Sequence, residues 1–166
     1  MAAVTIRPMV PDDWYRVREI YEAGIATGIA TFETTAPTWE DWDRAHLQFS
    51  RLVSLEQERI TGWAALSPVS GRCVYGGVAE VSVYVDSGYR GKGKGKYLLN
   101  HLITESENNG IWTLQAGLFP ENTASLKIHL QSGFRLIGDR VRIGKLHKTW
   151  KDNLILEKRS NRVGID

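Results

Sequence analysis

Apolar residues recur along the chain at two spacings, one typical of strands and one typical of helices. Strand-like runs lie at 4–7, 52–56, 60–66, 78–85, 111–118, 134–143 and 149–157. Helical spacing of apolar residues marks 11–25, 38–52, 95–108 and 123–131. The order β-α-α-β-β-β-α-β-α-β-β mixes the two kinds of element without strict alternation, so the pattern predicts an α+β (mixed α/β) fold.

No linker, internal repeat or low-complexity segment divides this pattern. A chain of 166 residues is long enough to bury one proper core. We therefore expect residues 1–158 to form a single domain and residues 159–166 to form a flexible C-terminal tail.

The stretch 81–96 combines a strand, a glycine-rich basic turn and the start of a helix. The strand ends at Val85, and the turn then alternates cations with glycines: Arg90, Gly91, Lys92, Gly93, Lys94, Gly95 and Lys96. Glycines let the backbone approach a ligand closely, and the free N–H groups of a helix start favour anions. The turn is a candidate phosphate site, although a solvated loop between strand and helix would look similar.

Two common phosphate motifs do not fit this turn. A P-loop that starts at Gly88 reaches Gly93-Lys94, but Gly95 stands where the magnesium-binding hydroxyl is needed. The dinucleotide spacing Gly-x-Gly-x-x-Gly fails from both Gly91 and Gly93. What remains is Arg90-x-x-Gly93-x-Gly95, whose successive N–H groups can form an anion-binding concavity.

Composition and charge exclude several classes of partner. The net charge of +2 does not favour nucleic acid or a membrane surface, and no window approaches the length of a membrane span. The single cysteine, Cys73, rules out an internal disulfide and a cysteine-based zinc site. The first residues lack the apolar run of a signal peptide, so we expect a cytoplasmic protein.

Glu80 is a carboxylate within an apolar strand, on the face opposite Val81, Val83 and Val85. One interpretation is a solvent-facing residue of a half-exposed strand. The other is a general base, because a carboxylate with a raised pKa can take a proton from an amine.

A second polar group lies at the start of the helix 123–131. Asn122 is a preferred N-cap residue and Ser125 stands at the third helical position, so a purely structural cap explains both. His129 follows Ser125 by four residues and shares its helix face. It is either a packed histidine or a proton donor.

These residues carry a resemblance to a known family. Val-Tyr-Val-Asp-x-x-Tyr-Arg-Gly-Lys-Gly-x-Gly at 83–95 resembles the acetyl-CoA-binding motif of the GCN5-related N-acetyltransferases, the GNAT superfamily. Further stretches resemble its phosphinothricin and methionine sulfoximine N-acetyltransferase group: 31–34, 71–75, 122–134 and 145–152. The resemblance covers about residues 4–158.

The resemblance implies a fold and an activity. The expected fold has a mostly antiparallel sheet of six to seven strands and about four helices, splayed between strands 78–85 and 111–118. The expected activity is acetyl transfer from acetyl-CoA to the primary amine of an amino-acid-like acceptor such as phosphinothricin, methionine sulfoximine or methionine sulfone. Alternatives are another amine (a peptide N-terminus, a polyamine or an aminoglycoside), a non-catalytic acyl-CoA-binding protein and, least favoured, a nucleic-acid-binding module.

The resemblance also assigns roles to residues. Glu80 would be the base, and His129 would protonate the departing thiolate. Acetyl-CoA would contact Val83, Tyr84, Val85, Arg90, Gly91, Lys92, Gly93, Lys94, Gly95, Lys96, Asn122 and Ser125. The acceptor would contact Phe32, Glu33, Arg72 and Tyr75, an arginine being suited to a substrate carboxylate. No metal is needed, and a homodimer is implied.

Overall fold

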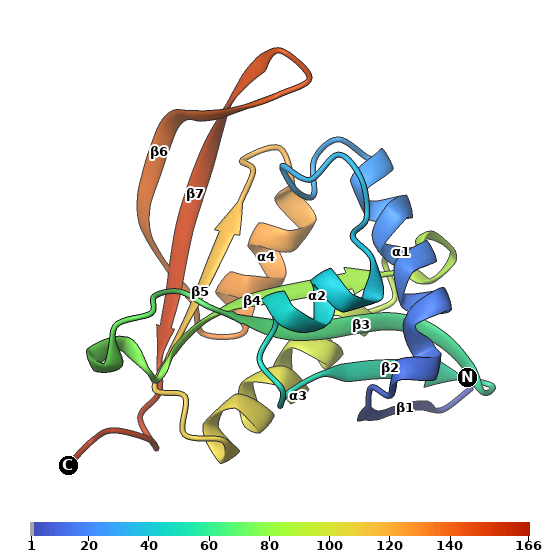
Figure 1. Ribbon diagram of the computed structural model, residues 1–166, viewed down its shortest axis with the longest axis horizontal. Coiled ribbons are helices and arrows are strands. Elements are labelled where there is room, and N and C mark those ends of the chain that lie inside the picture. The colour runs from blue at the N-terminus through green and yellow to red at the C-terminus, as the bar shows by residue number, and fades with distance from the viewer. Residues whose placement is uncertain (1) are drawn as a thin grey trace.

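The computed structural model of the protein, which describes residues 2–166, is built on one seven-stranded sheet (Figure 1). The spatial order is β1-β2-β3-β4-β5-β7-β6. Neighbouring strands are antiparallel except β4 and β5, which are parallel. The strands are β1 (Val4–Pro8), β2 (Leu52–Glu56), β3 (Arg59–Pro68), β4 (Val78–Val85), β5 (Thr113–Leu118), β6 (Arg135–Leu146) and β7 (Thr149–Arg159). The predicted mixed fold and its mostly antiparallel sheet are confirmed.

Four helices cover the two faces of the sheet. They are α1 (Trp14–Ala26), α2 (Trp39–Ala45), α3 (Lys94–Asn108) and α4 (Thr123–Gln131). Three 3₁₀ turns are η1 (Pro11–Asp13), η2 (Cys73–Tyr75) and η3 (Ser87–Tyr89). The connection from β4 to β5 runs through α3, as a parallel pair requires.

Strand β3 separates two hydrophobic clusters because its side chains alternate between the faces. Trp63 and Ala65 pack with residues of α1 and α2, among them Val17, Ile20 and Trp42. Ala64 and Leu66 pack with the apolar side of α3, chiefly Leu98, Leu99 and Leu102. The period of two along β3 therefore places α1 and α2 on one face and α3 on the other.

The helix predicted at 38–52 is wrong in its second half. Thr38 caps α2 as expected, accepting the backbone N–H of Asp41, but the helix ends at Ala45 and His46 is extended. The Leu47 N–H donates to the carbonyl of Leu66 at 2.8 Å, so this segment is bonded to β3 instead of continuing the helix. The Arg51 guanidinium donates to the Asp43, His46 and Leu47 carbonyls, which keeps the helix end and the following loop together.

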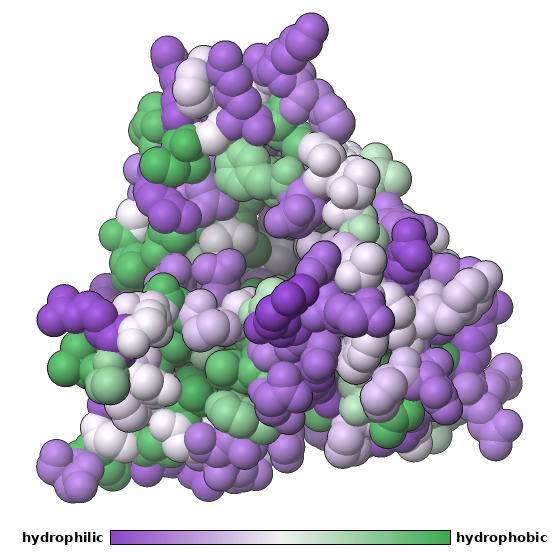
Figure 2. Space-filling model, in the orientation of Figure 1, coloured by the Kyte–Doolittle hydropathy of each residue, from purple (hydrophilic) through white to green (hydrophobic). Residues whose placement is uncertain are grey.

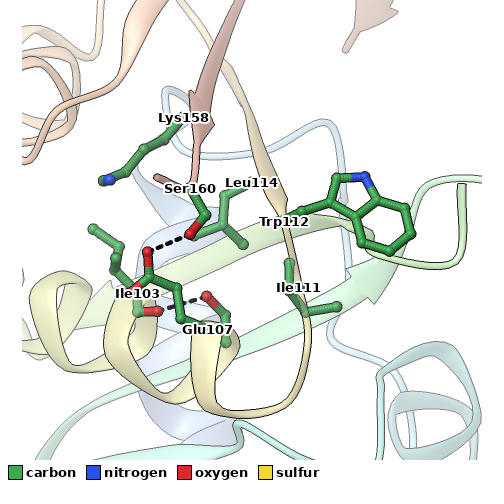
Figure 3. Close-up of a pocket in the computed structure, with 8 residues that line it drawn as sticks. Ile103, Glu107, Ile111, Trp112, Leu114, Lys158 and Ser160 are labelled. Atoms are coloured by element: carbon green, nitrogen blue, oxygen red, sulfur yellow. Dashed lines mark hydrogen bonds between the residues drawn. The ribbon is translucent and has the colours of Figure 1, made fainter. Parts of the chain in front are cut away.

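The last residues of the chain lie against the end of α3 and the start of β5. The hydroxyl of Ser160 donates to Glu107 Oε1 at 2.8 Å, as Figure 3 shows, and Arg162 is 3.1 Å from Glu107 Oε2. Arg159 donates to the Trp112 carbonyl at 3.1 Å. Residues 160–162, which fall in the expected flexible tail, thus have specific partners in the structure.

Candidate active site

The sheet opens where β4 and β5 part. The two strands pair only from Val78 with Thr113 to Glu80 with Gln115. On its other edge β4 stays paired with β3 through Val85. Residues 81–85 therefore have no ladder partner on the β5 side within the part of the chain that the structure describes. The predicted splay is confirmed.

A cavity of about 910 Å³ lies at this opening. It is lined by β4, by the turn that follows β4, by β5, by α4 and by the loop after α1. Figure 2 shows the surface hollowed near the centre of the view. A cavity of this size, with polar groups converging on it, is large enough for a cofactor arm and a small acceptor.

The basic glycine turn forms one end of the cavity. Gly91 and Gly93 have φ values of 73° and 75°, a left-handed conformation that glycine adopts without steric cost. A Cβ added to either would meet nothing within 4 Å, so both positions border open space. Gly93 is the N-cap of α3 and supplies no side-chain cap, which leaves the first N–H groups of the helix available to an anion.

The cations of this turn do not all face the cavity. Arg90 and Lys96 line it, and the Arg90 Nε also donates to the Val85 carbonyl at 3.2 Å. Lys92 is not among the lining residues and lies over the Tyr89 ring. Lys94 lines the cavity, but its side chain is only 6% exposed and its ammonium pairs with Glu56 of β2. The charge of Lys94 is thus directed to β2, and its backbone N–H is the group left for a phosphate.

Glu80 stands at the point where the two strands separate. Its side chain is half-buried, lines the cavity and lies 3.5 Å from Gln115 Nε2. Burial raises the pKa of the Glu80 carboxyl above its ordinary value, while the positive charge of Arg140 and the hydrogen bond from Gln115 work in the opposite direction. A carboxyl with a raised pKa that borders a cavity is suited to proton transfer near neutral pH.

The start of α4 combines the cap with a buried histidine. Asn122 Oδ1 accepts the Ser125 N–H at 3.3 Å, so the capping interpretation is confirmed. His129 Nδ1 lies 2.7 Å from the carbonyl of Ser125, and a carbonyl can only accept, so Nδ1 carries the proton.

The other ring nitrogen of His129 is not engaged by a protein group among residues 2–166. Nε2 is buried without a hydrogen-bond partner among residues 2–166, and His129 lines the cavity. Burial lowers the pKa of the imidazole. The neutral ring offers an acceptor at Nε2, and it becomes a donor there only by taking up a proton.

The loop after α1, residues 27–33, forms another wall of the cavity. Phe32 and Glu33 both line the cavity, as do Tyr21 and Tyr84. The Phe32 ring meets Phe119 edge to face, with centroids 4.7 Å apart. Burial raises the pKa of the Tyr84 hydroxyl, so β4 contributes a neutral phenol to the cavity.

Two residues predicted for the acceptor lie elsewhere. Arg72 and Tyr75 belong to the exposed segment around η2, where the guanidinium lies 5.7 Å from the tyrosine ring centroid. Neither lines the cavity. Conversely, His46, Arg140 and Asn153 line it and were not singled out from the sequence. These residues come from segments without a motif. The pairing of β6 with β7 places Arg140 and Asn153 at the cavity, and the end of α2 places His46 there.

Two further properties of residues 2–166 bear on other classes of site. No group of three or more His, Cys, Asp and Glu side chains is placed to hold a metal ion there. None of the helices in the same range is at once long enough and apolar enough to cross a membrane.

A splayed sheet, a glycine-rich turn at a helix start and a half-buried carboxylate share one cavity, which is the arrangement expected of an acetyl-CoA-dependent acetyltransferase. Residues 14–134 match the acetyltransferase (GNAT) family, and the chain belongs to this family. Acetyl-CoA is its cosubstrate, and the open space at Gly91 and Gly93 fits the approach of its phosphates.

Individual relatives are similar over most of the chain. The YwnH protein of Bacillus subtilis is 35% identical over 136 residues, covering 79% of this chain and 83% of its own. The L-methionine sulfoximine/L-methionine sulfone acetyltransferase of Salmonella typhimurium is 29% identical over 161 residues, 90% of each chain. The crystal structure of a phosphinothricin acetyltransferase from Sinorhizobium meliloti in complex with acetyl-CoA superposes with a TM-score of 0.89 at 26% identity, covering 98% of this chain and 91% of that one.

Proposed function

We propose that the protein transfers the acetyl group of acetyl-CoA to the primary amine of a small amino-acid-like acceptor, of the phosphinothricin, methionine sulfoximine or methionine sulfone type. The observation that carries the proposal is Glu80, a desolvated carboxylate that shares one cavity with the phosphate-binding turn. The similarity to acetyltransferases for such amino acids supports the class of acceptor.

In this mechanism, the turn 90–96 holds the pyrophosphate through its backbone N–H groups, while Arg90 and Lys96 add charge. The free edge of Val83, Tyr84 and Val85 pairs with the amides of the cofactor arm, and a backbone N–H at or next to Val83 polarises the thioester carbonyl. Asn122 and Ser125 contact the same arm from α4.

Glu80 removes a proton from the acceptor ammonium, and the free amine attacks the thioester carbon. A nitrogen–carbon bond forms, the carbon–sulfur bond breaks, and the thiolate leaves and takes up a proton. Phe32 and Glu33 lie against the acceptor.

A CoA-release screen tests this function. The acceptors are phosphinothricin, methionine sulfoximine and methionine sulfone, with spermidine, an aminoglycoside and a short peptide as the other classes of amine. We expect thiol release to be fastest with the three amino acids. Faster release with a polyamine, aminoglycoside or peptide would reassign the acceptor, and no release with any amine would favour a non-catalytic acyl-CoA-binding protein.

We assign the final protonation of the thiolate to His129, after uptake of a proton at Nε2. Replacing His129 with phenylalanine keeps an aromatic ring against Phe134. Because a thiolate is a stable leaving group, we expect kcat to fall by roughly 10²-fold, the lower end for general acid catalysis, with KM for acetyl-CoA little changed. Steady-state kinetics measure both, and an unchanged kcat would restrict His129 to packing.

We also propose that the protein forms a homodimer through β6 and β7. β6 is an edge strand, and the hairpin extends away from the helices at the top of Figure 1. Its exposed large apolar side chains are Leu136, Ile137, Val141, Ile143 and Trp150. Apolar groups gathered on an unpaired edge favour association with a second copy.

Sedimentation equilibrium of the Trp150→Glu variant tests the dimer. We expect the wild type to sediment at twice its chain mass of 18.7 kDa and the variant at 18.7 kDa, because a charge in an apolar interface is costly. Tyr15→Glu, at an exposed aromatic residue of α1, is the matched control and is expected to stay dimeric. A wild type that sediments at 18.7 kDa would contradict the proposal.

The cytoplasm is the proposed location. The one cysteine, Cys73, is free and exposed, which fits a reducing compartment. Cell fractionation with an antibody to the protein tests this assignment, and recovery outside the cytoplasmic fraction would contradict it.

A further inference from the structure

A row of polar positions continues from Glu80 across the sheet to β6. Glu80 is in register with Gln115 on β5, and Gly117 lies two residues further along β5 on the same face. The Asn153 amide from β7 lies over Gly117, because a Cβ added there would come within 3.1 Å of Asn153 Oδ1. Arg140 is in register with Asn153 and donates from Nη2 to Oδ1 at 2.7 Å.

Because position 117 is a glycine, the Asn153 amide of β7 can lie against the floor of the cavity there. Glu80, Gly117, Asn153 and Arg140 all line the cavity. Burial raises the pKa of the Glu80 carboxyl, and the positive charge of Arg140 opposes this rise, so the two groups interact electrostatically. Arg140 and Glu80 thus face one space that no side chain from position 117 fills.

Arg140 comes from a different part of the fold than the other cations that line the cavity. Among residues 2–166, the lysines and arginines that line the cavity are Arg90, Lys94, Lys96, Lys127 and Arg140. The first three belong to the phosphate-binding turn and the start of α3, and Lys127 belongs to α4. Among these five cations, Arg140 alone comes from a strand of the sheet, β6.

An α-amino acid acceptor needs a cation to bind its carboxylate close to the base. Its carboxyl carbon lies about 2.5 Å from its amine nitrogen, because only the Cα separates them. When the amine meets Glu80, the carboxylate must therefore lie close beside that residue. An unpaired carboxylate next to Glu80 would be repelled by it, whereas a guanidinium can bind a carboxylate with two parallel hydrogen bonds.

We propose, on the basis of the function proposed above, that Arg140 binds the α-carboxylate of the acceptor. Asn153 holds one end of the guanidinium through Nη2, which fixes its plane and leaves the remaining N–H groups for the carboxylate. Arg140 is thereby the residue that selects amino acids over amines without a carboxylate. Arg72, the arginine that the sequence suggests for this role, lies outside the cavity.

The test compares L-methionine sulfone with its carboxamide, which has the same amine and side chain but no negative charge. Acetyl-CoA-dependent CoA release is measured for the wild type, Arg140→Gln and Arg140→Lys at a pH above the acid limb of the rate profile. We expect Arg140→Gln to lower kcat/KM for the acid by roughly 10- to 100-fold, the effect of losing charge-assisted hydrogen bonds, and to leave the carboxamide within twofold. Arg140→Lys keeps the positive charge but cannot make two parallel hydrogen bonds. Its kcat/KM for the acid is expected to lie between those of the wild type and Arg140→Gln.

Arg135→Gln is the matched control, because Arg135 lies on the same strand, pairs with Glu157 and does not line the cavity. It is expected to behave as the wild type on both substrates. Arg72→Gln is measured beside it. The assignment to Arg140 would be overturned if Arg140→Gln lowered kcat/KM equally for the acid and the carboxamide, or lowered it for neither. It would also be overturned if Arg72→Gln, instead of Arg140→Gln, lost kcat/KM selectively for the acid. If the wild type releases no CoA with any amino acid, the proposed function itself fails, and this result is distinct from the others.

Discussion

Replacing Glu80 with glutamine is expected to lower kcat/KM by about 10²- to 10⁴-fold, the range for loss of a general base. The acid limb of the pH–rate profile should also disappear. In the wild type the rate should rise with pH through the pKa of the Glu80 carboxyl, which burial places above its ordinary value, because only the ionised form accepts a proton. Rates measured from pH 5 to 9 at saturating acetyl-CoA give both results.

Stability separates this loss of activity from unfolding. Because the folded-state pKa of Glu80 is raised, the residue favours the folded protein below its unfolded-state pKa, and this contribution is lost as pH rises through the folded value. At neutral pH the neutral glutamine should therefore leave the free energy of unfolding unchanged or increase it. Glu157→Gln, which removes a carboxylate from the same sheet outside the cavity, is the control and should keep wild-type activity. If Glu80→Gln showed wild-type kinetics, Glu80 would not be the general base.

Replacing Gly93 with valine is expected to weaken acetyl-CoA binding by roughly 10²-fold or more, comparable with the loss of one or two charge-assisted hydrogen bonds. The new side chain would project into the open space that borders this position. It would also keep the phosphates from the N–H groups at the start of α3. Isothermal titration with acetyl-CoA measures the change.

A matched control separates the blocked site from backbone strain. Gly110, just after the other end of α3, has a φ of 81° and also borders open space, but it does not line the cavity. Valine at either position should destabilise the fold by about 1–2 kcal/mol, the cost of a left-handed conformation. Only Gly93→Val should lose acetyl-CoA binding, and equal affinities of the two variants would show that the turn is not the phosphate site.

Strong local signals made part of this structure predictable. Strand 78–85 and helix 123–131 have the predicted boundaries, because a β-branched run and an Asn cap mark them. The helix at 38–52 was predicted too long because its apolar spacing continues past Ala45, while the hydrogen bond from Leu47 to β3 is a tertiary contact that spacing does not reveal.

The site was predictable where a motif carried it and not where pairing between strands built it. Glu80 and the glycine turn come from one continuous stretch, so their proximity follows from the sequence. Lys94 looks like a phosphate ligand until the structure pairs it with Glu56, 38 residues earlier. Arg140 has no local signal, since only the register of β6 on β7 and of β7 on β5 brings it near Glu80.

The pairing of β4 with β3 limits how the gene for this protein can change. Glu80 is opposite Ser67, and the ladder runs unbroken from Ala79 to Val85. Because side chains alternate along a strand, deletion or insertion of one codon before Glu80 within β4 would turn the carboxylate towards α3. New acceptors are then more readily reached through substitutions in the 27–33 loop and the β6–β7 hairpin, which border the cavity and leave this register intact.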